Sequence, residues 1–310
     1  MLRTALVLVL FATFIGCRQQ ANQQPAQGME PVSEAGMEAW EPLFNGNDLS
    51  DWVIKFADRE IGVNYKNTFR AEDGMIRVVY DEYETFGDAY AHMYYRKPYS
   101  YYKLRFDYRF TGEQTPGGEV WNNRNSGIMV HSQSAESNDF GQDFPVSIEV
   151  QLLGGLGDGE RHTANLCTPG TAVEINGAVN YDHCIDSASE TYNGDGWVHV
   201  EVVVLGGESI THIVEGDTVL TYQKPQITGF FINQGQDQAD WSAFGISDSS
   251  PWRSRAGEIL TEGYISLQAE SHPIDFRNIE LLDLCGCTDP KAANYKSYYV
   301  KSDSTRCRYE

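Results

Sequence analysis

The sequence predicts an all-β fold, a two-sheet antiparallel sandwich, and three observations favour it. Short runs of the chain alternate apolar and polar residues. These runs end at Gly, Asn or Asp, as half-buried strands joined by turns do. Sustained helical periodicity is nearly absent between residues 40 and 284. Because the predicted strands are numerous and close together, one domain of about 245 residues is more economical than two.

The predicted strands follow one another along the chain, and turns such as Asp73-Gly74 separate them. The pattern is clearest in residues 69–79, 103–110, 145–153, 197–206, 212–222 and 263–268. Other polar stretches are too long for hairpins and predict loops that shape a binding edge. These are residues 111–124, 132–144, 154–196 and 233–257.

The charge of the chain excludes one class of partner. The 310 residues include 23 Lys and Arg against 44 Asp and Glu, a formal net charge of −21. Such a surface repels a nucleic-acid backbone, so we expect no nucleic-acid partner. Aromatic residues make up 12% of the chain. They suit stacked sheets, and they also suit a groove in which sugar rings lie on aromatic faces, so a carbohydrate partner is expected.

Residues 1–17 predict a lipoprotein signal peptide. An apolar run from Ala5 to Ile15 is too short to span a bilayer, and a small residue precedes Cys17 as in the bacterial lipobox, whose cysteine is diacylated. Residues 18–39, rich in Gln, Pro, Ala and Gly, predict a flexible tether. We therefore expect a lipid-anchored protein of the bacterial cell envelope, periplasmic or outer-membrane, that meets the membrane only through this anchor. A secreted protein without an anchor is the alternative.

Export to an oxidising compartment makes the other cysteines candidates for disulfides. Cys167 and Cys184 lie in one loop-like stretch, and closing it would stabilise the fold by about 3 kcal/mol. In the tail of residues 285–310, Cys287 with Cys307 is the preferred pair, which leaves Cys285 over. Pairing through Cys285 is the alternative.

Polar residues that face one way on otherwise apolar strands are the strongest functional signal. Alternation in residues 124–131 and 145–153 places one set of polar side chains opposite the core. If the two strands pair, these side chains converge on one concave patch that can abstract a proton and bind hydroxyls. They are Asn125, His131, Glu149 and Gln151. Simple exposure to solvent is the alternative.

Further candidates lie beside these strands, in the loop that follows Glu149, or in the last strands. They are Arg124, Arg161, Asn165, His183 and Gln268. Trp241 stands among amides and acids, and either forms a sugar-facing wall or pins its loop into a minor core. Acidic strings at residues 81–84 and 237–240 offer oxygen ligands without the spacing of a calcium loop, so no metal ligands are assigned.

Several ordered motifs resemble the 3-keto-disaccharide hydrolase domain family. They are EPLFNGNDLSDW, NSGIMVH, FPVSIEVQLLGG, NLCTPGT and GYISLQAESHPIDFRNIELL, and the resemblance covers about residues 40–284. It implies a jelly-roll sandwich of the concanavalin A-like lectin/glucanase type, with a ligand groove on its concave sheet. It also implies an exported enzyme that cleaves glycosides oxidised at C3. The tail of residues 285–310 resembles cysteine-bridged appendages of other envelope proteins.

The expected mechanism differs from that of a retaining glycosidase. Laminarinase-like relatives on this sandwich carry Glu, then Asp two positions later, then a second Glu. Here Gln151 replaces the Asp, and Leu153 and Gly154 replace the second Glu. A 3-keto sugar needs no such pair, because the ketone acidifies the hydrogen on C2. One base can remove that proton, and the C1 substituent leaves by β-elimination, after which water can add back.

Within this mechanism Glu149 or His131 is the expected base, and His183 assists the leaving group. Enolate stabilisation and positioning of hydroxyls are expected from Asn125, Gln151 and Arg124. No cofactor is expected, since the redox step would belong to another enzyme, although a divalent cation could replace Arg124. The alternatives are a non-catalytic, lectin-like carbohydrate-binding protein, which needs no poised base, and an envelope scaffold.

Overall fold

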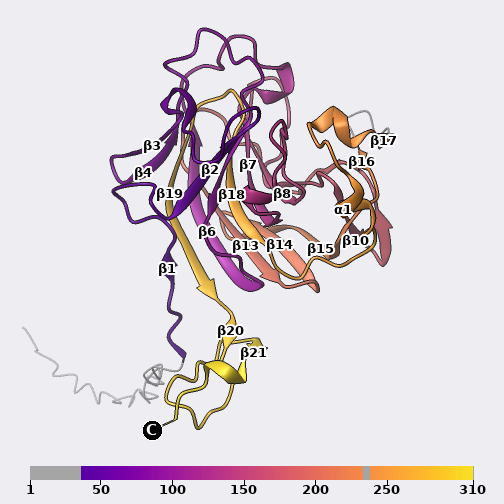
Figure 1. The fold of residues 1–310 in the computed structure, drawn as a ribbon. Coiled ribbons are helices and arrows are strands. Elements are labelled where there is room, and N and C mark those ends of the chain that lie inside the picture. The colour runs from indigo at the N-terminus through magenta and orange to yellow at the C-terminus, as the bar shows by residue number, and fades with distance from the viewer. Residues whose placement is uncertain (1–35, 233–237, 310) are drawn as a thin grey trace, which may run out of the picture.

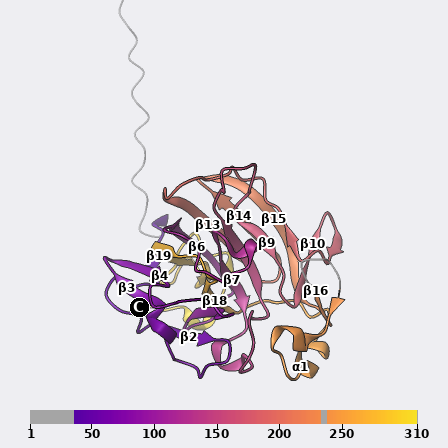
Figure 2. The same cartoon turned by 90° about the horizontal axis from the view of Figure 1, so that it is seen from above.

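The computed structural model describes residues 36–232 and 238–309. Cys17, the signal peptide and most of the predicted tether lie outside the described residues. Two antiparallel sheets stack into a sandwich, as Figures 1 and 2 show. The predicted all-β class is therefore confirmed. Within the described ranges, no helix has the length and apolar character needed to cross a bilayer.

The larger sheet contains ten strands in the order β11-β10-β15-β14-β13-β6-β19-β4-β3, with β1 paired to β19. Their bounds are β1 (Glu41–Pro42), β3 (Phe69–Glu72), β4 (Met75–Val78), β6 (Tyr101–Phe110), β10 (Thr171–Ile175), β11 (Ala178–Asn180), β13 (Val198–Leu205), β14 (Ser209–Val214), β15 (Asp217–Ile227) and β19 (Ile274–Asp283). Strand β6 shows the predicted alternation, because Leu104 and Phe106 are buried while Arg105 is only half-buried.

The smaller sheet contains seven strands in the order β12-β9-β8-β7-β18-β5-β2. Their bounds are β2 (Trp52–Phe56), β5 (Ala91–Tyr95), β7 (Asn125–Ser132), β8 (Ile148–Leu153), β9 (Asn165–Cys167), β12 (Cys184–Ile185) and β18 (Tyr264–Ala269). Strands β9 to β12 lie in residues 154–196, which were predicted to be a loop. Each has five residues or fewer, too short for its polar sequence to show a period.

The main core lies between the sheets. Phe106 and Phe276 of the larger sheet belong to one buried apolar cluster with Ile128, Val150 and Leu267 of the smaller sheet. Burial of this apolar surface is the main stabilising contribution to a sandwich. Because alternate residues of each strand enter this core, the polar residues between them are left on the opposite face of the sheet.

A separate small core forms beside the smaller sheet. It joins Val146, Phe231, Trp241 and Ile246. The segment that carries it contains β16 (Phe231–Ile232), β17 (Gln238–Ala239), the 3-10 turn η5 (Trp241–Phe244) and α1 (Ser250–Arg253). Figure 1 shows β16, β17 and α1 together at one side of the sandwich.

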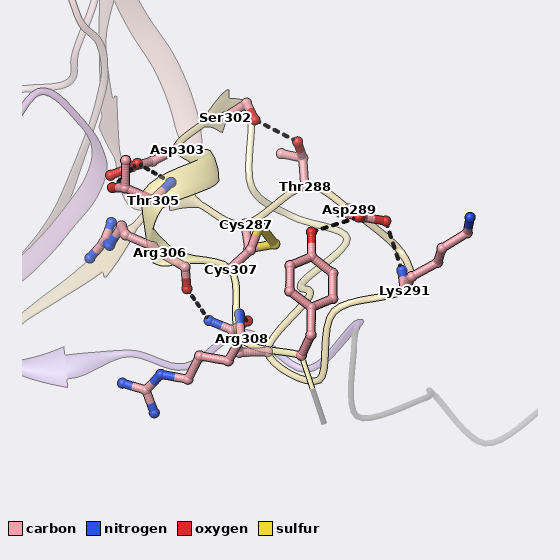
Figure 3. The surroundings of a disulfide bond; sticks show 12 residues. Cys287, Thr288, Asp289, Lys291, Ser302, Asp303, Thr305, Arg306, Cys307 and Arg308 are labelled. Atoms are coloured by element: carbon pink, nitrogen blue, oxygen red, sulfur yellow. Dashed lines mark hydrogen bonds between the residues drawn. A yellow bond between two sulfur atoms is a disulfide. The ribbon is translucent and has the colours of Figure 1, made fainter.

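The C-terminal tail forms a small unit at the end of β19 (Figure 1). Strands β20 (Cys285–Gly286) and β21 (Lys301–Ser302) pair in parallel, and a Cys287–Cys307 disulfide closes the unit. Figure 3 shows this disulfide together with the hydrogen bond from Thr288 to Ser302. A second disulfide joins Cys167 to Cys184, and Cys285 is a free thiol. Both predicted disulfides are confirmed.

Candidate functional site

The outward face of the smaller sheet carries a row of mostly polar residues that crosses six strands. Lys55 of β2 pairs with His92 of β5, which pairs with Gln268 of β18. The β18–β7 register then places Gln268 beside Gly127. Beyond Gly127 the row continues through β8 and β9 with Gln151 and Asn165. Residues far apart in the sequence therefore lie side by side across the sheet.

The side chain of Glu149 reaches this row, although the residue itself belongs to the neighbouring row of the sheet. It lies between Met129 of β7 and Cys167 of β9 in the register of the sheet. Its side chain leans over Gly127, where a Cβ atom would stand only 2.5 Å from the Glu149 Oε1 atom. The absent side chain at Gly127 thus makes room for the carboxyl group. This brings the carboxyl between the positions of Gln268 and Gln151.

Burial makes this carboxyl unusual. Glu149 is only 6% exposed, and desolvation raises its pKa from 4.5 to about 8. Within the described part of the chain, no Lys or Arg lies within ion-pair distance of it. A carboxyl group with a pKa near neutrality is suited to general base or acid chemistry.

A second buried carboxyl lies on the same face. In β18 and just after it, Ile265, Leu267 and Ala269 enter the core, so Gln268 and Glu270 point the other way. Glu270 is 2% exposed. Burial raises its pKa well above the usual value, and the nearby Glu149 raises it further while Arg161 opposes the shift. The sequence analysis missed Glu270, although extending the alternation beyond Gln268 by two residues would have found it.

Several buried polar atoms at or beside this face have no protein hydrogen-bond partner among the described residues. Unpaired buried polar groups are costly, and their concentration in one place is typical of a site that binds a polar ligand. They are His92 Nε2, Asn125 Oδ1, Ser266 Oγ, Gln268 Nε2 and Oε1, Glu270 Oε2, and both ring nitrogens of His272. Burial lowers the pKa of His92 to about 3 and that of His272 to about 4, so both rings are neutral.

Asn125 and Gln151 lie on this face, as predicted. Asn165, which was expected in a loop, joins the face from strand β9. Asn125 is held by a hydrogen bond from its amide nitrogen to the Trp121 carbonyl, at 3.2 Å. Asn165 donates to Gln151 Oε1 at 3.4 Å, and its own oxygen accepts from the Ser187 amide at 2.9 Å. These contacts fix the amide orientations and leave the Asn125 oxygen without a hydrogen-bond partner among the described residues.

Two arginines border the face. Arg161 donates to the carbonyls of Gly154 at 2.7 Å and Arg124 at 3.2 Å, and burial lowers its pKa. Arg124 turns away toward a neighbouring loop, where it contacts the Gly194 carbonyl and lies 3.4 Å from Asp195. Arg161 is therefore the arginine whose charge acts on Glu270, while Arg124 is engaged elsewhere.

His131 does not join this face. Strand β7 carries one extra residue between Met129 and Ser132 relative to β18, and His131 sits at this irregularity with a φ of 49°. Such a bulge reverses the alternation, so the ring points toward the larger sheet. There Nε2 lies 2.9 Å from the carbonyl oxygen of Gly206. The prediction that His131 shares the hollow with Glu149 is corrected by this geometry.

His183 directly precedes Cys184, whose strand β12 lies two strands away from the β8 strand that carries Glu149. Cys167 pairs with Glu149 on one side and with Cys184 on the other. The backbone carbonyl of His183 accepts a hydrogen bond from Thr168 at 2.9 Å. Burial lowers the pKa of His183 to about 4, so its ring is neutral at physiological pH.

Trp241 belongs to the small core rather than to a sugar-facing wall. It is 1% exposed, packs edge-to-face on Phe231 and donates from Nε1 to the Gly229 carbonyl at 3.2 Å. Its assignment as a substrate-binding residue is corrected by this burial. The aromatic surface beside the polar row comes instead from Trp121 and Phe144, which both pack on Tyr90. The ring of Phe144 also lies edge-on to the His92 ring, with 6.2 Å between the ring centroids.

Among the residues that the structure describes, no group of three or more His, Cys, Asp or Glu side chains is arranged to hold a metal ion. Asp81 of the first acidic string pairs with Arg70. Asp237 of the second lies outside the described ranges.

A family model described as the 3-keto-alpha-glucoside-1,2-lyase-like domain matches residues 39–282. The chain belongs to this family. The match confirms the resemblance that the ordered motifs predicted over nearly the same residues. The family description names a 1,2-lyase of 3-keto-α-glucosides, that is, an elimination across C1 and C2. A search of curated proteins found no match.

Several solved structures are similar to this chain at low sequence identity. A protein assigned as a glycosyl hydrolase from Parabacteroides distasonis ATCC 8503 is 19% identical, covering 78% of this chain and 98% of that one, with a TM-score of 0.45. A Bacillus subtilis protein of unknown function with a galectin-like fold is 11% identical, covering 80% and 97%, with a TM-score of 0.45. The Bacillus subtilis carbohydrate binding module CBM66 is 10% identical, covering 79% and 96%, with a TM-score of 0.36.

Proposed function

We propose that this family member cleaves glycosides that carry a ketone at C3. It removes the C2 proton, the C1 substituent leaves by β-elimination, and addition of water gives net hydrolysis. The observation that carries the proposal is the buried Glu149 carboxyl over Gly127, whose neighbours in the sheet register are Gln151 and Gln268. The family description also names an elimination across C1 and C2 of a 3-keto-α-glucoside.

Glu149 is the base in this proposal. The ketone makes the C2 hydrogen acidic, and a carboxylate whose pKa lies near 8 is a far stronger base than an exposed one. Proton removal leaves negative charge on the C3 oxygen. The unpartnered Gln268 amide can donate to this oxygen, and one such donor typically contributes about 3 to 4 kcal/mol to the transition state.

The sugar hydroxyls have partners on the same face. Among the described residues, the Asn125 oxygen and the His92 Nε2 atom have no hydrogen-bond partner, so both can bind a hydroxyl. Trp121 and Phe144 supply aromatic surface beside them, on which the apolar face of a sugar ring can pack. These groups can bind and orient the substrate without taking part in proton transfer.

The proposal is tested with 4-nitrophenyl 3-keto-α-glucoside and its unoxidised counterpart. We expect the protein to release nitrophenol from the keto sugar only. Glu149→Gln should lower kcat/KM by about 10³-fold, within the usual range for loss of a general base. Glu262→Gln, an exposed residue just before β18, is the matched control and should change nothing. Binding of the keto sugar without turnover by the unaltered protein would instead identify a lectin-like protein.

We further propose that the chain is a lipid-anchored envelope protein, acylated at Cys17. The two disulfides of the described part support an oxidising compartment. Metabolic labelling with an alkyne fatty acid should mark the protein, and Cys17→Ala should abolish the label. Equal labelling of both forms would contradict the anchor.

A further inference from the structure

Glu270 is a buried carboxyl that the base chemistry leaves unused. Its Oε2 atom has no hydrogen-bond partner among the described residues, and the side chain is 2% exposed. A structural carboxyl at this depth is normally neutralised by an ion pair or by several donated hydrogen bonds. Asp275 in the larger sheet is such a case, because Arg77 and Arg109 both donate to it. Glu270 shows no such pairing, which points to a chemical role.

The sheet brings Glu270 to the same place as Glu149. The β18–β7 register pairs Leu267 with Ile128, so continuing it places Glu270 opposite Asn125. Asn125 and Glu270 therefore lie at one side of the Gln268–Gly127 pair, while the Glu149 carboxyl stands over Gly127 itself. The unpartnered Asn125 and Glu270 oxygens both belong to this cluster.

The charged and titratable groups around Glu270 favour its protonated form. Glu149 repels a negative charge there, and the hydroxyls of Tyr80 and Tyr90 lie close enough for Glu270 to affect their pKa values. Arg161 attracts a negative charge, but it is held by two backbone carbonyls. His272 is neutral. Two carboxyls sharing such a site do not both ionise, so one carries a proton while the other serves as a base.

We propose that Glu270 is the general acid that protonates the departing glycosidic oxygen. This inference rests on the proposed function, in which Glu149 removes the C2 proton. It assigns the two proton transfers of the elimination to two carboxyls of one buried pair, in place of His183.

Protons and electrons are conserved in this elimination. Glu149 takes the C2 proton, and the C2–H electron pair forms the enolate double bond between C2 and C3. The enolate then re-forms the ketone, C1=C2 forms, and the C1–O bond breaks as the Glu270 proton moves to the leaving oxygen. Glu149 now carries a proton and Glu270 is ionised.

These protonation states are the ones that hydration requires. Ionised Glu270 takes a proton from a water molecule as the water oxygen attacks C1. Glu149 returns its proton to C2. The pair is thereby restored to its starting state, and the net reaction is hydrolysis. No oxidant, reductant or added co-reactant enters the balance.

The test compares two leaving groups. Methanol leaves from methyl 3-keto-α-glucoside only with help from an acid, whereas nitrophenolate leaves from the 4-nitrophenyl 3-keto-α-glucoside without it. Glu270→Gln should lower kcat/KM for the methyl glucoside by at least about 10²-fold and for the nitrophenyl glucoside by less than about 5-fold. Glu270→Asp, which keeps an acid, should recover part of the lost methyl glucoside activity. Glu262→Gln again serves as the control.

Exchange of the C2 hydrogen in D₂O separates the two hypotheses. Glu270→Gln should still exchange the C2 hydrogen of the methyl glucoside, because Glu149 is intact, while Glu149→Gln should not. Equal losses on both substrates in Glu270→Gln, or loss of C2 exchange, would overturn the acid assignment and leave the proposed function standing. Failure of the unaltered protein to cleave either substrate or to exchange C2 hydrogen would overturn both.

Discussion

The outward faces of the two sheets both carry charged side chains, but the two faces differ in whether the buried carboxyls form ion pairs. On the larger sheet, charges are paired across strands. Arg105 contacts Glu280 at 2.8 Å, and Arg277 contacts Asp107 at 3.0 Å. On the smaller sheet, the carboxyls of Glu149 and Glu270 are more deeply buried than most of these groups, yet no basic side chain within the described ranges forms an ion pair with either.

The electrostatic consequences differ accordingly. Burial would raise the pKa of Asp107, but hydrogen bonds from His199, Asn278 and Arg277 hold it below its usual value. No such donors act on Glu149, so burial alone raises its pKa. Charge on the larger sheet therefore supports the fold, whereas on the smaller sheet folding works against ionisation. Groups held at such a cost are suited to catalysis.

The largest expected effect on stability is at Asp275. Its carboxylate is fully buried and bridges Arg77 and Arg109, whose side chains are 29% and 31% exposed. Asp275→Asn leaves one arginine facing an amide nitrogen and should lower the free energy of unfolding by about 3 kcal/mol. Urea denaturation measures this, and kcat/KM of the folded variant should be unchanged. A loss of less than about 0.5 kcal/mol would remove the distinction between the two faces.

Gly127→Ala tests the smaller sheet by geometry alone. The added Cβ would stand 2.5 Å from Glu149 Oε1, so the carboxyl must move although its chemistry is unchanged. A displacement of this kind should cost about 10²-fold in kcat/KM for the keto sugar. Circular dichroism should show an intact fold. Unaltered activity would mean that the position of the carboxyl over Gly127 is not needed.

The pH dependence of stability and activity should run in opposite directions. Burial raises the pKa of Glu149 from 4.5 to about 8, so the folded protein keeps a proton that the unfolded chain releases. Stability from this group is present below the unfolded-state pKa and is lost as the pH rises toward about 8. Activity should rise over the same range, because the base must be ionised.

Thermal unfolding from about pH 5 to about pH 9 measures the stability trend. The Tm of Glu149→Gln should improve relative to the unaltered protein as the pH rises. A parallel pH dependence in both proteins would show that Glu149 titrates normally.

The smallest effect is expected at Glu280. Its pair with Arg105 is similar in length to those of Asp275, but the two side chains are 32% and 35% exposed. Solvent screens such a pair, so Glu280→Gln should lower the free energy of unfolding by only about 0.5 kcal/mol. Added salt should reduce the difference further. An effect as large as that of Asp275→Asn would show that burial does not set the value of these pairs.

The amino-acid sequence by itself determined the all-β class, the alternation of β6 and β8 and the family, and it favoured both disulfides while leaving a pairing through Cys285 open. These follow from local patterns, because alternation and cysteine spacing are read from neighbouring residues. It also placed Glu149 and Gln151 on one face, since a regular strand keeps its two-residue period. Glu270, just after β18, continues the period of that strand, so the same reasoning could have found it.

Tertiary structure decided where the pattern breaks and which strands meet. The extra residue in β7 turns His131 toward the larger sheet, a reversal that alternation cannot predict. Packing on Phe231 draws Trp241 into a small core. The approach of Glu149 to Glu270 requires that β8, β7 and β18 be neighbours. The β7–β18 pairing joins residues more than a hundred positions apart, such as Ile128 and Leu267. Burial, and with it the chemistry of both carboxyls, exists only in the assembled sandwich.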